Sequence, residues 1–181
     1  MVVLVLVGIV GSMFYNFFNV NLGSYLRLQQ DAGEAGSIAA QSQRVASVVR
    51  GTTGIVSATA NELVIYAYFY PSDTYVSKVR YYLSGDKKLL YTDVTSMTSN
   101  PPIGTPITAS KKTYTVARAF YLPAGGNLFS YIDASQTPLS YPIADLNAVK
   151  AVQVNLAIKD ATGAAQDLGV QVALRNRKTN L

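Results

Sequence analysis

The sequence predicts an α+β fold, in which a long N-terminal α-helix packs through its second half on an antiparallel β-sheet domain. Three observations lead to this prediction. Residues 1–26 carry no charged side chain, residues 22–50 keep the spacing of an amphipathic helix, and the chain after Gly54 alternates apolar and polar residues as strands do. At 181 residues the chain has room for one ordinary domain and an N-terminal appendage.

The first segment, MVVLVLVGIVGSMFYNFFNV, raises the question of a membrane helix. Residues 1–26 are enough to cross a hydrocarbon core of about 30 Å as a helix that rises about 1.5 Å per residue. No basic residue precedes the apolar run, and aromatic residues prolong it, unlike a secretory signal peptide. A cleaved signal and a plain single-pass anchor remain alternatives to a segment that also takes part in assembly.

The region that follows keeps a helical period without a proline until Pro71. Gly51 to Gly54 then supply a stop signal, so we expect one helix from Met1 to about Arg50, on the order of 75 Å long. The apolar first half of this helix would project away from the β domain. The face expected to pack on the sheet comprises Ala35, Ile38, Ala39, Val45, Ala46 and Val49. The predicted boundaries are a helical region at 1–54, divided into 1–26 (transmembrane or filament core) and 27–50 (amphipathic), and a globular β domain at 55–181.

The remainder of the chain reads as a series of strands. Residues 61–70 alternate up to Pro71, and residues 76–94 predict a hairpin with its turn at Ser84 to Asp86. Residues 95–110 hold three prolines and predict a surface loop. Further strands are expected in residues 112–122 and 128–142. The alternation in residues 148–160 and 168–177 predicts a closing hairpin.

The composition argues against most enzyme mechanisms. The chain has a formal charge of +5 and neither cysteine nor histidine, so it lacks a thiolate nucleophile, a cysteine metal site and the usual acid–base residue near neutral pH. Its carboxylates at Glu62, Asp73, Asp93 and Asp133 are dispersed singly. We therefore expect neither enzymatic activity nor a cofactor or metal.

Two sequence patterns suggest ligands, each with a structural alternative. Tyrosines at 66, 68 and 70, with basic residues at 78, 80, 87 and 88, could stack and neutralise single-stranded nucleic acid, or could form an ordinary sheet face. The segment DATGAAQD places Asp160 and Asp167 around a glycine, which suggests either a calcium loop or a hairpin turn.

The segment MVVLVLVGIVGSMF resembles the apolar N-terminal region of type IV pilins and of the pseudopilins of type II secretion. Members of that superfamily commonly have Met, a β-branched run and then Gly, a pattern that Met1, Val2, Val3 and Gly8 match. The segments SVVRGTTGIVSATANELVIYAYFYPSDTYVSKVRYYL, FSYIDASQTPL and AVKAVQVNLAIKD resemble J-type pseudopilins and W-type minor pilins more loosely. The resemblance covers the whole chain and implies a pilin-like fold.

The resemblance also implies a function. It suggests a subunit held in the cytoplasmic membrane and then polymerised into an extracellular filament, with other copies, related pilins and assembly machinery as partners. The residues expected in the filament core are Met1, Val2, Val3, Leu4, Val5, Leu6, Val7, Gly8, Ile9, Val10, Gly11, Ser12, Met13, Phe14, Phe17 and Phe18. The alternatives are a minor or priming pseudopilin and a non-polymerising membrane-anchored adhesin or binding module.

One position departs from the family pattern. Members carry a Glu four residues after their methylated N-terminal residue, and Val5 stands there if Met1 is the mature terminus. Either the protein lacks this Glu or Met1 is an internal position of a longer helix. We expect the second, because Met1 and Gly8 match the internal part of the pattern.

Overall fold

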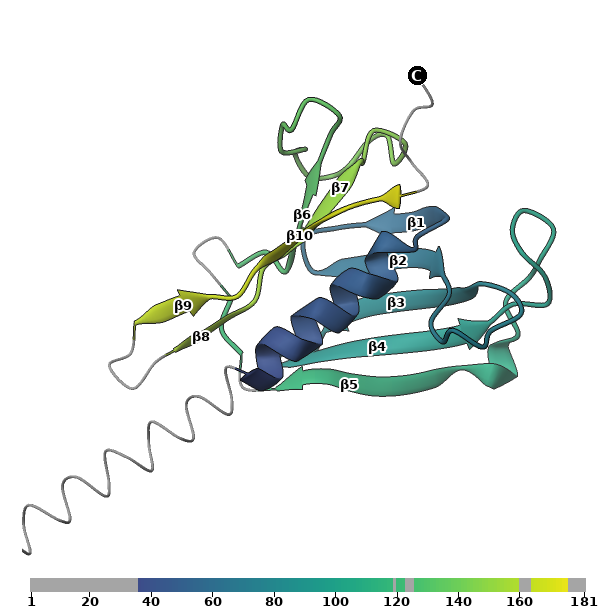
Figure 1. Ribbon diagram of the computed structural model, residues 1–181, viewed down its shortest axis with the longest axis horizontal. Coiled ribbons are helices and arrows are strands. Elements are labelled where there is room, and N and C mark those ends of the chain that lie inside the picture. Colours follow the sequence, from purple (N-terminus) through teal and green to yellow (C-terminus); the bar gives the residue numbers. More distant parts are fainter. Residues whose placement is uncertain (1–35, 119, 123–125, 160–163, 176–181) are drawn as a thin grey trace, which may run out of the picture.

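The structure is a computed structural model that describes residues 36–118, 120–122, 126–159 and 164–175 (Figure 1). Within these residues it contains one α-helix, at 36–50, a short 3-10 helix, η1, at Thr108–Ser110, and ten strands. The strands are β1 Gly54–Ala58, β2 Glu62–Ala67, β3 Ser77–Leu83, β4 Leu89–Ser96, β5 Lys112–Arg118, β6 Phe129–Ile132, β7 Ala151–Val154, β8 Ala157–Lys159, β9 Ala165–Asp167 and β10 Val170–Ala173.

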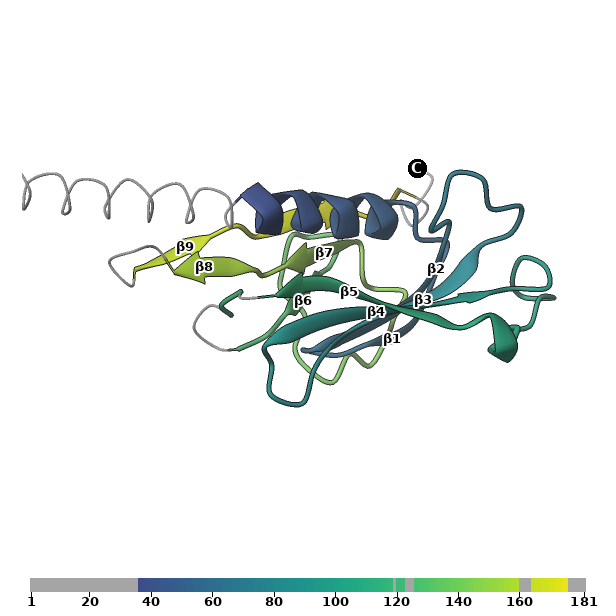
Figure 2. The same cartoon turned by 90° about the horizontal axis from the view of Figure 1, so that it is seen from below.

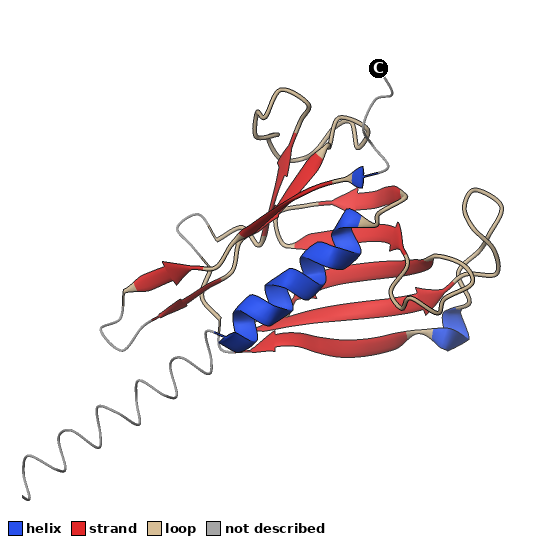
Figure 3. Cartoon of the chain, in the orientation of Figure 1, coloured by secondary structure: helices blue, strands red, loops and turns tan. Residues whose placement is uncertain are grey.

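The predicted fold class, built around a long N-terminal helix, is wrong. The described part of the chain holds one short helix, and most of its regular structure is antiparallel sheet, as the red arrows of Figure 3 show. One helix was predicted for residues 1–50 because no proline interrupts them. The absence of a helix breaker permits a helix but does not require one. Residues 1–35, including Ala35, lie outside the described residues.

Ten strands form three antiparallel sheets in the described structure. The main sheet has the order β1-β2-β3-β4-β5, in which each strand pairs with its neighbour in sequence. The second sheet has the order β10-β7-β6, and β8 pairs with β9. The predicted hairpin of residues 76–94 is confirmed as β3 and β4. The predicted closing hairpin is confirmed in part, because β7 pairs with β10 but the separate β8–β9 pair lies between them in the chain.

The helix of residues 36–50 lies on one face of the main sheet (Figure 2). Its buried side chains recur at helical spacing, which places them on one side. Ala39 is half-buried, and the buried residues are Ile38, Ser42, Val45, Ala46, Val48 and Val49. The helix ends where the backbone N–H groups of Gly51 and Thr52 bond to the carbonyls of Val48 and Val49, both at 3.1 Å. The amphipathic pattern thus fixes this helix against the core.

The core connects the helix with two of the sheets. Leu63 and Ile65 of β2 point toward the helix, while Phe129 and Tyr131 of β6 enter from the second sheet, and all four are at most 2% exposed. Two polar contacts join the sheets at the β1–β2 turn: the Phe129 N–H bonds to the Ala60 carbonyl at 3.0 Å, and the Tyr131 hydroxyl donates to the Thr59 carbonyl at 2.9 Å. The sheets therefore share one interior.

The predicted loop after β4 is held in one conformation by hydrogen bonds. The Thr98 N–H bonds to the Thr105 carbonyl at 3.0 Å, and the Asn100 side-chain oxygen accepts from the Val76 N–H at 2.9 Å. A Cβ on Gly104 would lie 1.7 Å from the Ser99 carbonyl oxygen, so this close approach requires glycine. The loop presents Ile103, which is 87% exposed.

Candidate functional site

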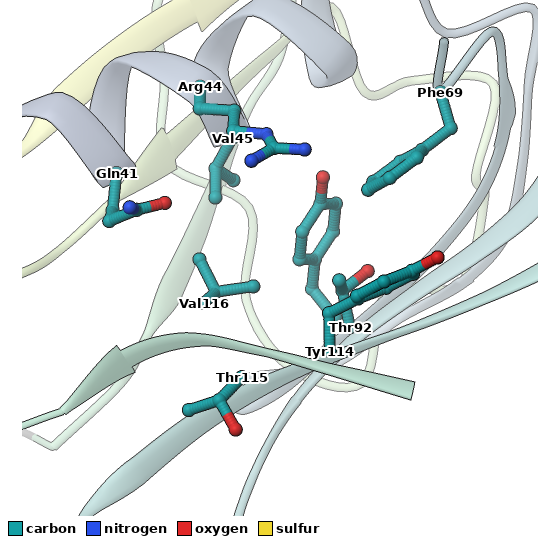
Figure 4. A pocket seen from close by; sticks show the side chains of 9 residues that line it. Gln41, Arg44, Val45, Phe69, Thr92, Tyr114, Thr115 and Val116 are labelled. Carbon is teal, nitrogen blue, oxygen red and sulfur yellow. The ribbon is translucent and has the colours of Figure 1, made fainter. Parts of the chain in front are cut away.

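A pocket of about 130 Å³ lies between the helix and the main sheet (Figure 4). Its wall combines apolar side chains with an arginine, an amide and several hydroxyl groups. The helix supplies one side, Phe69, two residues after the end of β2, closes it, and the strands β3, β4 and β5 form the floor. The lining residues are Gln41, Arg44, Val45, Phe69, Tyr81, Thr92, Tyr114, Thr115 and Val116.

Arg44 is the charged group of this pocket. The Cζ atom of its guanidinium lies 5.6 Å from the centroid of the Phe69 ring, and Figure 4 shows the side chain reaching from the helix toward that ring. Phe69 in turn stacks on Tyr114, with ring centroids 6.0 Å apart. The attraction between a cation and an aromatic face holds the guanidinium at the opening without neutralising it.

Hydroxyl groups surround this cation. Burial raises the pKa of the Tyr81 phenol, so that phenol is protonated at neutral pH. The Tyr70 hydroxyl donates to the Tyr114 hydroxyl at 3.0 Å, and this hydrogen bond raises the pKa of Tyr70. The carboxylate of Asp73 accepts from the Tyr70 backbone N–H at 3.0 Å. The pocket thus offers neutral hydroxyl groups next to a positive charge.

A second cluster lies on the opposite face of the main sheet, around the buried carboxylate of Asp93. Thr113 Oγ1 donates to Asp93 Oδ1 at 2.6 Å, and Lys111 Nζ lies 2.9 Å from Oδ2. Arg80 Nη1 lies 3.8 Å from Asp93 Oδ2, and Arg80 Nη2 donates to Glu62 Oε2 at 2.5 Å. Burial alone would raise the pKa of Asp93, but the bonds from Thr113 and Lys111 outweigh it and hold that pKa below its ordinary value.

Replacing Asp93 with asparagine should lower the free energy of unfolding at pH 7 by about 1–3 kcal/mol, because the charge-assisted hydrogen bonds are lost. The lowered pKa of Asp93 also means that its stabilisation is present above the ordinary carboxyl pKa and is lost as the pH falls below about 4. Asp93→Asn should therefore flatten the acid dependence of stability. Urea unfolding of the full chain in nonionic micelles, between pH 7 and acid, measures both effects.

Asp145→Asn is the matched control for removing one negative charge, since Asp145 is exposed and caps its own turn by accepting from the Asn147 N–H at 2.8 Å. Equal stability of the Asp93→Asn variant and the unmodified chain at pH 7 would contradict a stabilising role for the cluster.

The predicted row of tyrosines and basic residues is only partly assembled. Tyr66 pairs with Lys78 across β2 and β3, on the same face as Arg80. Tyr70 contacts Tyr114 beside the pocket instead, and Lys87 lies in the β3–β4 turn. Arg80 Cζ lies 4.3 Å from the centroid of the Tyr82 ring, and the guanidinium forms an ion pair with Glu62, so its charge is already paired within the chain. Nucleic-acid binding stays an untested prediction.

A shallow groove of about 220 Å³ adjoins this face. It is lined by Lys78, Arg80, Asp93, Thr95, Pro106, Thr108 and Lys111. The sequence reading missed that β4 would place Asp93 between Arg80 and Lys111. The hairpin register, which pairs Arg80 with Asp93, was the signal that could have found it.

The other predicted site residues divide between described and undescribed positions. The filament-core residues between Met1 and Phe18 lie outside the described residues. Asp160 of the alternative calcium loop also lies outside, while Asp167 accepts from the Gly169 N–H at 2.8 Å, as in a turn. Among the described residues there is no group of three carboxylates close enough to hold a metal, and no helix with the length and apolar character needed to span a membrane.

No protein-family model matches the sequence, and a search of curated proteins found no similar sequence. The resemblance to pilins and pseudopilins therefore rests on the residues quoted for it.

Proposed function

We propose that the chain is a structural subunit of a type IV pilus-like filament. It would be held in the cytoplasmic membrane by its N-terminal segment and then polymerise through that segment into a filament outside the cell. The alternative is a minor or priming pseudopilin of a type II secretion system, which binds partner pilins and does not build filament length. The proposal requires an apolar element for assembly and a folded domain tied closely to it.

The observation that carries the proposal is the position of the uncharged segment in the chain. Residues 1–26 carry no charge, and only residues 27–35 separate them from the helix of residues 36–50. An uncharged apolar segment of this length is stable in lipid or against other apolar segments, and small residues such as Gly8 and Gly11 let such segments approach closely.

The attachment of that helix to the domain supports the same proposal. Val45 and Val49 of the helix are at most 1% exposed and belong to the same core as the main and second sheets. A force that reaches the helix of residues 36–50 would thus be transmitted to the domain through packed side chains. A filament subunit needs this kind of attachment.

A non-polymerising membrane-anchored binding module is the second candidate. The exposed Ile103 favours the binding module. The hydrogen-bonded loop after β4 holds this apolar side chain in solvent, where a partner could contact it.

The test compares the full chain with a variant that lacks residues 1–26, both produced in the cells that make the protein. We expect the full chain in the membrane fraction and in filaments sheared from the surface. The shortened variant should be absent from both, although near-UV circular dichroism should show it folded. Filaments made mainly of this chain indicate a major subunit, and traces in other filaments indicate a minor one. Full-length chain found only as membrane monomers would contradict the filament proposal and favour the binding module.

A further inference from the structure

We propose that the pocket between the helix and the main sheet is a binding site for a carboxylate group, with Arg44 as its principal ligand-binding residue. This site does not depend on the proposed filament role, because it is formed within one copy of the chain. Four features of the pocket support it: an uncompensated cation, an unpartnered buried hydroxyl, the absence of acidic lining residues, and a wall suited to a short apolar stem.

The cation is the first feature. Arg44 makes no ion pair and no hydrogen bond with any residue that the structure describes, and its Phe69 contact leaves the guanidinium edge free. Arg80 on the opposite face is different, because Glu62 and Asp93 both engage it. A guanidinium carries five N–H donors in a fixed fork that matches the two oxygens of a carboxylate. Arg44 therefore has the donors that such a ligand needs.

The buried hydroxyl is the second feature. Thr92 is 2% exposed and lines the pocket, and its Oγ1, which lies beside the Tyr81 hydroxyl, makes no well-formed hydrogen bond within the described structure. Such a group costs about 1–3 kcal/mol when it stays unsatisfied, so most buried hydroxyls have a partner. The Tyr114 hydroxyl, which accepts from Tyr70 at 3.0 Å, keeps its own proton to donate. A ligand oxygen in the pocket would give these groups an acceptor.

Charge and shape select the ligand class. None of the nine lining residues is acidic, and the carboxylate of Asp73, bonded to the Tyr70 N–H, lies outside the lining. The wall also contains Val45, Phe69 and Val116, which favour a methyl or methylene stem over the fully hydrated surface of inorganic phosphate. A volume of about 130 Å³ admits a carboxylate on a short stem but not a nucleotide.

Acetate is the probe for this site. The full chain in nonionic micelles is titrated with sodium acetate against sodium chloride at constant ionic strength, and the methyl NMR signals of Val45 and Val116 are followed. We expect saturable shifts, with inorganic phosphate binding more weakly. Arg44→Met should weaken acetate binding at least tenfold. Arg44 and Arg50 are both exposed residues of this helix, but Arg50 does not line the pocket, so Arg50→Met should leave acetate binding unchanged.

The proposal is overturned if acetate produces no saturable shift, if Arg44→Met binds acetate as well as the unmodified chain, or if phosphate binds more tightly than acetate. The methyl spectrum of each variant shows whether it is folded.

Sedimentation velocity in the same micelles identifies the source of the carboxylate. Self-association that falls with acetate and with Arg44→Met would indicate an acidic side chain of a second copy. A chain that remains monomeric while binding acetate would indicate a free small carboxylate.

Discussion

Replacing Phe129 with alanine is expected to lower the free energy of unfolding by about 3–5 kcal/mol, the range for removing a buried aromatic side chain. Phe129 has no exposed surface and belongs to the cluster in which the helix, the main sheet and the second sheet meet. Its backbone N–H bonds to the Ala60 carbonyl in the β1–β2 turn and its side chain belongs to the shared core, so the cavity would weaken contacts between the two sheets. Urea unfolding of the full chain in nonionic micelles, followed by circular dichroism, measures the loss.

Ile103→Ala is the control for this substitution, because Ile103 is a large apolar residue that is 87% exposed. It should change the free energy of unfolding by less than about 0.5 kcal/mol. If Phe129→Ala were no more destabilising than Ile103→Ala, the two sheets would not share the interior that the structure shows.

Local sequence patterns locate individual strands. The alternation in residues 61–70 predicted β2, which ends at Ala67 and buries Val64 as well as its neighbours Leu63 and Ile65. The turn residues Ser84 to Asp86 predicted the β3–β4 hairpin. Alternation does not specify the partner of a strand, however. The division into three sheets, with β6 beside β7 and a separate β8–β9 pair, depends on long-range contacts that no local pattern encodes.

The pocket could not have been predicted for the same reason. In sequence, Arg44 is one of several polar residues on the solvent side of an amphipathic helix. Only the packing of the helix across the sheet brings its guanidinium over Phe69 and opposite Thr92. The predicted length of the helix depends mainly on residues 1–35, which lie outside the described residues.

Replacing Gly11 with leucine is expected to abolish filaments while the membrane-bound pool of the protein remains. Under the proposed function, the N-terminal segments pack against one another through van der Waals contacts, since lipid offers no hydrophobic driving force between them. A leucine at position 11 would separate the backbones at a small-residue position. It would add apolar surface, however, and so would not weaken the interaction with lipid. Shearing the cells and quantifying filaments and membrane fractions separately measures the two quantities.

Gly36→Leu is the matched control, because it makes the same substitution at a glycine where an added Cβ meets no atom within 4 Å. This variant should assemble normally. Abundant normal filaments from Gly11→Leu would contradict close packing at that position. Loss of filaments from both variants would instead show that any enlarged side chain in this part of the chain blocks assembly, and close approach at Gly11 would then not be the controlling contact. The pair of substitutions therefore separates a specific packing contact from a general sensitivity to bulk.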